Sequence, residues 1–150
     1  MKTDDKQGVN RMNGMISAMQ KYNIPLDQEY MQLFDTDGMY EAPYVLVQEL
    51  MRKKDRPTAI VCYNDQYALM AIQAIHDSGL SVPGDISVVG YDDSLDMMQG
   101  NVKLTTVMHP KKEMGQQAAR FLVGMLNGRL ECPQKMFQPE LIVRNSCKSV

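Results

Sequence analysis

The chain has 150 residues, of which 44% are hydrophobic and 23% are charged, and its formal net charge is −2 at pH 7. This composition is that of an ordinary globular domain with one sizeable core, and it excludes a disordered or fibrous chain. The longest apolar runs are too short for a membrane span or a signal peptide, and the scattered Lys and Arg residues provide no electrostatic surface for nucleic acid.

The first third of the chain predicts a helix, a short strand and a second helix. Apolar residues recur at helical spacing between Gly8 and Tyr22, and Asn23-Ile24-Pro25 ends that pattern. A short apolar stretch at 31–34 runs into the polar turn 35–38, which predicts a strand and its exit loop. A further helix is expected over about 43–52.

The middle of the chain predicts two strands joined by a helix. Residues 58–62 form one apolar run, and residues 86–90 form another. Near-continuous apolar runs of this length are typical of parallel strands that are buried on both faces. Between them Asn64 is expected to cap a helix that Gly79 stops. The residues expected to face inward from this helix are Ala68, Ala71, Ile72 and Ile75.

The last third predicts a short extended segment at 104–107, a helix that begins near Pro110 and stops at Gly128, and a closing strand at 140–144. That helix carries Met114, Ala118, Phe121, Leu122 and Met125. Alternating strands and helices predict an α/β fold, a three-layer Rossmann-like parallel sheet with right-handed connections.

Polar residues follow each predicted strand, where ligands bind in open α/β sheets. The four places are 35–38, 63–65, 91–93 and 108–110. Carboxylates and amides at such places suit the adjacent hydroxyl groups of a sugar, and Arg11 on the first helix could add a forked donor. Tyr63 or Phe34 could stack on the apolar face of a sugar ring.

Each of these residues also has a purely structural interpretation. Asn64 is a favoured helix cap with or without a ligand, and Asp92 can form an Asx turn. Asp93 is interpreted as a solvated loop charge. Arg11 would by default be a surface charge, and His109 a loop residue next to a proline.

Signals for catalysis, cofactors and metals are weak. The sequence has no Walker loop, no G-x-G-x-x-G, no H-E-x-x-H and no G-x-S-x-G, and its two histidines, His76 and His109, lie far apart. We therefore expect no enzyme activity, no cofactor and no metal. The three cysteines, Cys62, Cys132 and Cys147, contain no C-x-x-C pair, which favours a reducing, cytoplasmic location. A periplasmic sugar-binding protein and an α/β sugar-processing enzyme remain the alternatives.

Five segments taken in order carry a resemblance to a known family: Arg11–Gly14, Ala59–Gln66, Val88–Ser94, Leu104–Val107 and Pro139–Arg144. Together they resemble the lactose/galactose-repressor family over nearly the whole chain. The resemblance implies a periplasmic-binding-protein-like sensor domain with two Rossmann-like subdomains around a sugar. Its sugar-contacting positions fall on Arg11, Asn64 and Asp92, with a polar contact at His109.

The resemblance also implies a domain arrangement and partners. Residues from about 6 to 93 and from 136 to 150 would form the second subdomain, and residues from about 104 to 130 would pack on a first subdomain that is largely missing here. Tyr63 before the Asn-Asp pair and His109-Pro110 after the Thr-Thr pair are similar to family members that respond to L-arabinose. The implied protein is a homodimeric repressor of sugar catabolism, which the sugar inducer releases from operator DNA bound through a winged-helix domain absent from this sequence.

Overall fold

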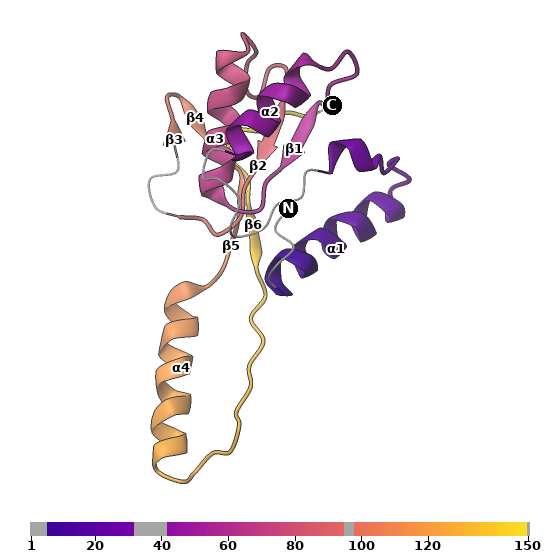
Figure 1. Cartoon of the computed structure of the whole chain (residues 1–150). Coiled ribbons are helices and arrows are strands. Elements are labelled where there is room, and N and C mark those ends of the chain that lie inside the picture. Colours follow the sequence, from indigo (N-terminus) through magenta and orange to yellow (C-terminus); the bar gives the residue numbers. More distant parts are fainter. Residues whose placement is uncertain (1–5, 32–41, 95–97, 150) are drawn as a thin grey trace.

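The computed structural model describes residues 6–31, 42–94 and 98–149. The chain combines helices with parallel strands, which confirms the predicted α/β class (Figure 1). The elements are α1 (Lys6–Lys21), the 3-10 turn η1 (Gln28–Tyr30), α2 (Ala42–Arg52), β1 (Ala59–Val61), α3 (Asp65–Asp77), β2 (Ser87–Val89), β3 (Met98–Gln99), β4 (Val102–Lys103), β5 (Thr106–Met108), α4 (Lys111–Leu126) and β6 (Glu140–Ile142).

The central sheet is parallel with one antiparallel strand. β1 pairs with β2 in parallel along its whole length, as the strand-helix-strand pattern predicts. Single parallel bridges at Val89 and Asp92 connect the β2 segment to the β5 segment, and β6 pairs antiparallel with β5. The carboxyl ends of the three parallel strands therefore meet at one edge, beside α1 and the start of α4.

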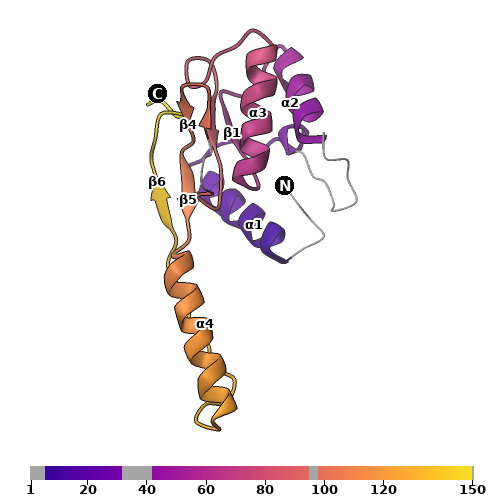
Figure 2. The same cartoon turned by 90° about the vertical axis from the view of Figure 1, so that its left-hand side faces the viewer.

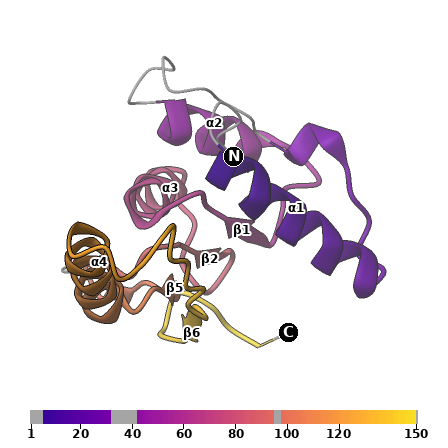
Figure 3. The same cartoon turned by 90° about the horizontal axis from the view of Figure 1, so that it is seen from below.

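One face of the sheet is covered by α2 and α3, which pack against each other (Figures 2 and 3). The core between helices and strands is filled by side chains that are at most 1% exposed. Burial of each large apolar side chain contributes about 1.5 to 3 kcal/mol to the free energy of unfolding. The largest of them are Ile72, Ile75, Ile86, Val88 and Leu104. All four residues predicted to face inward from α3 are buried.

The α3 helix begins where the sequence predicts. The Asn64 side-chain oxygen accepts a hydrogen bond from the Tyr67 N–H at 2.9 Å, which satisfies one of the free donors of the first helical turn. After the last turn, Gly79 adopts a φ of 76°, a left-handed conformation that glycine tolerates without steric cost. Both predicted signals for this helix are confirmed.

The prediction that residues 58–62 form a strand buried on both faces is wrong. Val61 is 49% exposed and Ala59 is also exposed, whereas Ile60 packs against the core. Successive side chains of a strand point to opposite faces, and within the described residues helices cover only the Ile60 side of β1. An apolar run shows that a strand is suited to burial, but it does not show that both faces have a partner.

Two further differences concern short elements. The predicted strand at 31–34 and turn at 35–38 lie outside the described residues, apart from Met31, which follows η1. The β3–β4 hairpin, in which Gly100 adopts a φ of 58°, is not among the predicted elements. The Gly100-Asn101 pair is a recognised hairpin signal that could have indicated this turn.

The α4 helix projects away from the rest of the molecule (Figures 1 and 2). It spans the predicted range, none of its residues is buried, and Leu122 and Leu126 are 59% and 77% exposed. After a bend at 131–132, the chain returns to β6 as an extended segment over 133–139 (Figure 1). Within the described residues, no helix is long and apolar enough to cross a bilayer.

The division of the chain between two subdomains stays a prediction. Leu104 and Thr106, at the start of the segment expected to pack on a first subdomain, are fully buried in the core beside β2. Residues 104–108 therefore belong to the same compact part as α2 and α3. The part of the chain that projects from it is α4 with the segment that leads back to β6, and β6 itself rejoins the sheet beside β5.

Candidate ligand-binding site

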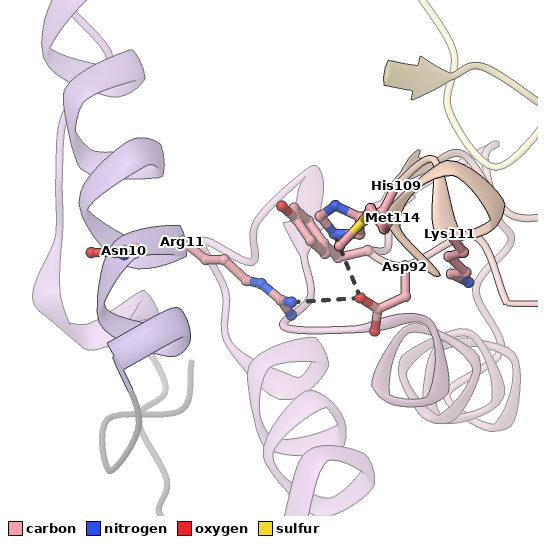
Figure 4. Close-up of a pocket in the computed structure, with 7 residues that line it drawn as sticks. Asn10, Arg11, Asp92, His109, Lys111 and Met114 are labelled. Carbon is pink, nitrogen blue, oxygen red and sulfur yellow. Dashed lines mark hydrogen bonds and ion pairs between the residues drawn. The ribbon is translucent and has the colours of Figure 1, made fainter. Parts of the chain in front are cut away.

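An open cavity of about 500 Å³ lies where the carboxyl ends of β2 and β5 meet α1 and the first turn of α4 (Figure 4). This volume is within the range of small-molecule sites, and the position is the one that the strand-end rule predicts. The lining residues are Asn10, Arg11, Tyr91, Asp92, His109, Lys111 and Met114.

Asp92 is at the centre of the polar groups that line the cavity. Its Oδ1 atom lies 3.5 Å from Nη2 of Arg11 and 3.9 Å from Nε2 of His109, and its side chain is 35% exposed (Figure 4). The carboxylate thus faces two nitrogen-bearing side chains and is still open to the cavity. It can accept hydrogen bonds from a bound molecule without leaving these neighbours.

Arg11 is held from several sides before any ligand binds. Its Nη1 atom donates to the backbone oxygen of Tyr63 at 2.7 Å. Its Cζ atom lies 3.9 Å from the ring centre of Tyr91 and 4.6 Å from that of Tyr63, so the guanidinium stacks between two aromatic faces. The Arg11 side chain is only 15% exposed. It is therefore a fixed hydrogen-bond donor, and the alternative that it is a solvated surface charge is wrong.

His109 and the start of α4 form the opposite wall. The His109 ring packs against Tyr91 with 4.9 Å between ring centres and an interplanar angle of 58°. Lys111 and Met114 come from the first turn of α4, directly after the predicted His109-Pro110 loop. Neither of them is among the predicted site residues. The signal that could have found them is their position one helical turn past a predicted strand end.

The structure brings together three of the predicted site residues: Arg11, Asp92 and His109. Tyr63 stacks on Arg11, so its ring supports the arginine from the side. Asn64 uses its side-chain oxygen to cap α3 and is not among the residues that line the cavity. Phe34 lies outside the described residues.

A buried polar cluster around Asp65 joins segments that carry residues of the site, and it is not among the sequence predictions. Asp65 is 1% exposed and its two carboxylate oxygens accept from the Thr106 hydroxyl at 2.5 Å and from the Ser94 N–H at 2.8 Å. Its backbone N–H donates to the Tyr91 oxygen at 2.9 Å. Gly90 lies so close to Asp65 that a Cβ atom there would be 2.3 Å from Oδ1. Asp65 therefore connects the segment after β2, which carries Tyr91 and Ser94, to Thr106 of β5.

The interpretation of Asp93 as a solvated loop charge is wrong. Its Oδ1 atom lies 2.6 Å from Nη2 of Arg144, and both side chains are partly buried, at 21% and 31% exposure. The partner is 51 residues away in sequence, two residues after β6. Local sequence could not indicate this pair.

Cys62 is expected to resist alkylation in the folded chain. Burial raises the pKa of its thiol to about 12, so at pH 8 only about one molecule in ten thousand carries the reactive thiolate. Cys132 is exposed. With iodoacetamide at pH 8, mass spectrometry of peptides should show Cys132 labelled first and Cys62 labelled at a comparable rate only in denaturant. Rapid labelling of Cys62 in the folded chain would contradict the burial of its thiol.

Comparison with known proteins supports the family that the sequence resembles. The family model described as periplasmic binding protein-like domain matches residues 1–147. A protein of Geobacillus stearothermophilus named arabinose metabolism transcriptional repressor is 44% identical over 153 residues, which cover 99% of this chain and 42% of that protein.

Solved structures agree with this. A regulatory protein of the LacI family from Chloroflexus aggregans matches with a TM-score of 0.84 and 29% identity, over 97% of this chain and 52% of that chain. A LacI family transcriptional regulator from Lactobacillus casei, solved with bound sucrose, matches with a TM-score of 0.77 and 26% identity, over 93% of this chain and 51% of that chain. The chain thus spans about two fifths of the curated relative and about half of each solved structure.

Proposed function

This chain belongs to the periplasmic binding protein-like domain family, and from that membership we propose that it is the sugar-sensing part of a transcriptional repressor. The ligand we propose is L-arabinose or a closely similar sugar. Support comes from the arabinose metabolism repressor that is 44% identical and from the structural neighbour with bound sucrose. The observation that carries the proposal is the Arg11–Asp92 pair facing an open cavity at the strand ends.

The chemistry of the cavity suits a polyhydroxylated ring. Arg11 offers donors only and Asp92 offers acceptors only, so together they can hold neighbouring hydroxyl groups that both give and take hydrogen bonds. The side chains of Tyr91 and Met114, which line the cavity, add apolar surface for the C–H side of a sugar ring. We propose that Asn64 and Tyr63 contribute from the rim, and that Phe34 belongs to the same site.

We further propose that the output is binding and not turnover. In the longer repressor, a cytoplasmic homodimer would grip operator DNA through a domain outside this sequence. Sugar would favour a closed arrangement of the two sensor subdomains, and the DNA affinity would fall by linkage. Residues 6–93 and 136–150 would be one subdomain, while the chain from Lys111 to about residue 130 would pack on the other.

Calorimetry of the full-length protein tests the proposal. We expect a saturable heat with L-arabinose and weaker or no heat with D-xylose, D-ribose and D-galactose. An anisotropy assay with promoter DNA should show release by the same sugars in the same order. Sugar binding without DNA binding would favour the periplasmic alternative, conversion of the sugar observed by NMR would favour the enzyme alternative, and no sugar binding at all would refute the proposal.

The 150-residue chain on its own is expected to self-associate through α4. Its apolar side chains Leu122, Val123 and Leu126 are 59%, 56% and 77% exposed, and a contiguous apolar surface of this kind is normally covered by another surface. Light scattering over a concentration series should report a mass above that of the monomer. The double change Leu122→Gln and Leu126→Gln should shift the mass toward the monomer, and the matched exposed change Lys112→Gln should not. A monodisperse wild-type monomer at every concentration would contradict this expectation.

A further inference from the structure

The loop that presents Asp92 has an unusual backbone. Asp92 has a φ of 109° and Asp93 has a φ of 45°, so two consecutive residues other than glycine lie in the left-handed half of conformational space. Such conformations are unfavourable for residues with a Cβ atom, and they persist only where the surrounding structure holds them. We call this loop the elbow (residues 91–94), and contacts from three other segments hold it.

Backbone hydrogen bonds fix the two flanks of the elbow. The Tyr91 oxygen accepts from the Asp65 N–H at 2.9 Å, and the Asp92 N–H donates to the Val107 oxygen at 2.9 Å. On the far side, the Ser94 N–H donates to the Asp65 carboxylate at 2.8 Å. The Asp93 N–H has a longer contact, 3.4 Å, with the Thr106 hydroxyl. The conformation of the elbow at Asp93 therefore depends more on contacts of the Asp93 side chain than on its backbone N–H.

Arg144 supplies the strong contact at that point. Its Nη2 atom donates to Asp93 Oδ1 at 2.6 Å, while Nη1 donates to the Leu104 backbone oxygen at 2.8 Å. Its own N–H donates to the Thr105 hydroxyl at 3.0 Å. One guanidinium thus connects the elbow to the segment that leads into β5, in a forked geometry that lysine cannot reproduce.

The Asp93–Arg144 ion pair lies outside the cavity, so its role is not direct contact with a ligand there. Neither Asp93 nor Arg144 is among the residues that line the cavity, whereas Asp92, the residue before Asp93, is. Lys111, which does line the cavity, donates from Nζ to the Asp93 backbone oxygen at 3.1 Å. The carboxylate of Asp93 is therefore bound by Arg144, and its backbone oxygen is bound by Lys111 from the wall of the cavity.

We propose that Asp93 and Arg144 are positioning residues of the sugar site, and that their ion pair holds the elbow in the conformation that directs the Asp92 carboxylate into the cavity. This inference rests on the proposed function. It assigns a binding role to a pair that does not touch the ligand, and it connects the end of β6 to ligand affinity.

The competing explanation is that the pair only stabilises the fold, and Asp93→Gly separates the two. Glycine adopts a φ of 45° without steric cost, so the backbone conformation stays accessible while the contact with Arg144 is lost. If the pair only stabilises the fold, Asp93→Gly should bind sugar as the wild type does below its melting temperature. If the pair positions Asp92, affinity should fall although the protein stays folded.

The experiment is calorimetry and thermal unfolding of the full-length protein with L-arabinose, D-xylose, D-ribose and D-galactose. We expect Asp93→Gly and Arg144→Gln each to weaken binding about tenfold, the lower end of what supporting contacts contribute around metal ligands. Arg144→Lys, which keeps the charge but not the fork, should lose less than Arg144→Gln. The double variant Asp93→Gly, Arg144→Gln should lose no more affinity than the single variant that binds sugar less tightly. The reason is that the two changes remove the same ion pair.

The controls are Asp55→Asn and Arg56→Gln, which alter exposed residues before β1, at the end of that strand away from the cavity. They should bind as the wild type does. Sugar affinity within twofold of the wild type in Asp93→Gly and Arg144→Lys would overturn the inference while leaving the proposed function intact, even if Arg144→Gln does not fold. A wild-type protein that binds none of the four sugars would overturn the proposed function and this inference together.

Discussion

Asp92→Asn in the full-length protein is expected to weaken sugar binding about ten- to hundredfold without unfolding the chain. A hydrogen bond to a charged group contributes about 1.5 to 3 kcal/mol, and each 1.4 kcal/mol is a factor of ten in affinity. The amide replaces one acceptor by a donor, which would then face the Arg11 guanidinium at the position where Nη2 now lies 3.5 Å from the carboxylate. The one remaining amide oxygen cannot accept from both Arg11 and the sugar as two carboxylate oxygens can.

Calorimetry with L-arabinose measures the effect, and thermal unfolding shows whether the variant is folded. Asp55→Asn makes the same chemical change on an exposed loop and should leave the affinity unchanged. An operator-release assay should show that more sugar is needed by the same factor. Sugar affinity of Asp92→Asn within twofold of the wild type would remove Asp92 from the site.

Gly90→Ala is expected to cause the largest loss of stability among the substitutions considered. A Cβ atom at this buried position would lie 2.3 Å from Asp65 Oδ1 and 2.7 Å from Leu104 Cδ2. Overpacking of a closed core costs about 1 to 3 kcal/mol, and here the clash also displaces a carboxylate that holds Thr106 and Ser94. Urea unfolding of the 150-residue chain measures the change in free energy of unfolding.

Gly115→Ala is the matched control for this prediction. Gly115 lies inside α4, and a Cβ atom there would meet nothing within 4 Å. Because alanine is the better helix former, this change should stabilise the chain by about 0.5 to 1 kcal/mol. Equal effects of the two substitutions would show that the space around Gly90 is not limiting.

The elements of the fold could be predicted because their signals are local. The α3 helix is the clearest case, since an asparagine cap, inward residues at helical spacing and a glycine stop lie within one short segment. The exposure of Val61 could not be predicted in this way, because it depends on what covers the outer face of β1 and not on the residues of β1. The same limit applies to α4, whose apolar side chains give no sign that they lie on a projecting helix.

The site was predictable to the extent that it follows from sheet topology and from the family resemblance. Arg11, Asp92 and His109 do lie around one cavity. The contacts that fix them come from distant segments, as with Arg144 and Asp93, and such pairs leave no local pattern in one sequence. Asn64 shows the opposite problem, because a residue with a strong local role as a cap can match a family motif equally well.

The shape of the α4 arm has a mechanical consequence. Its 16 residues extend about 24 Å at 1.5 Å per residue, and its first turn carries Lys111 and Met114 beside the cavity. A tilt of about 10° at this base would carry the tip about 4 Å sideways. Small adjustments around a bound molecule would be magnified into displacements large enough to rearrange a protein surface at the far end.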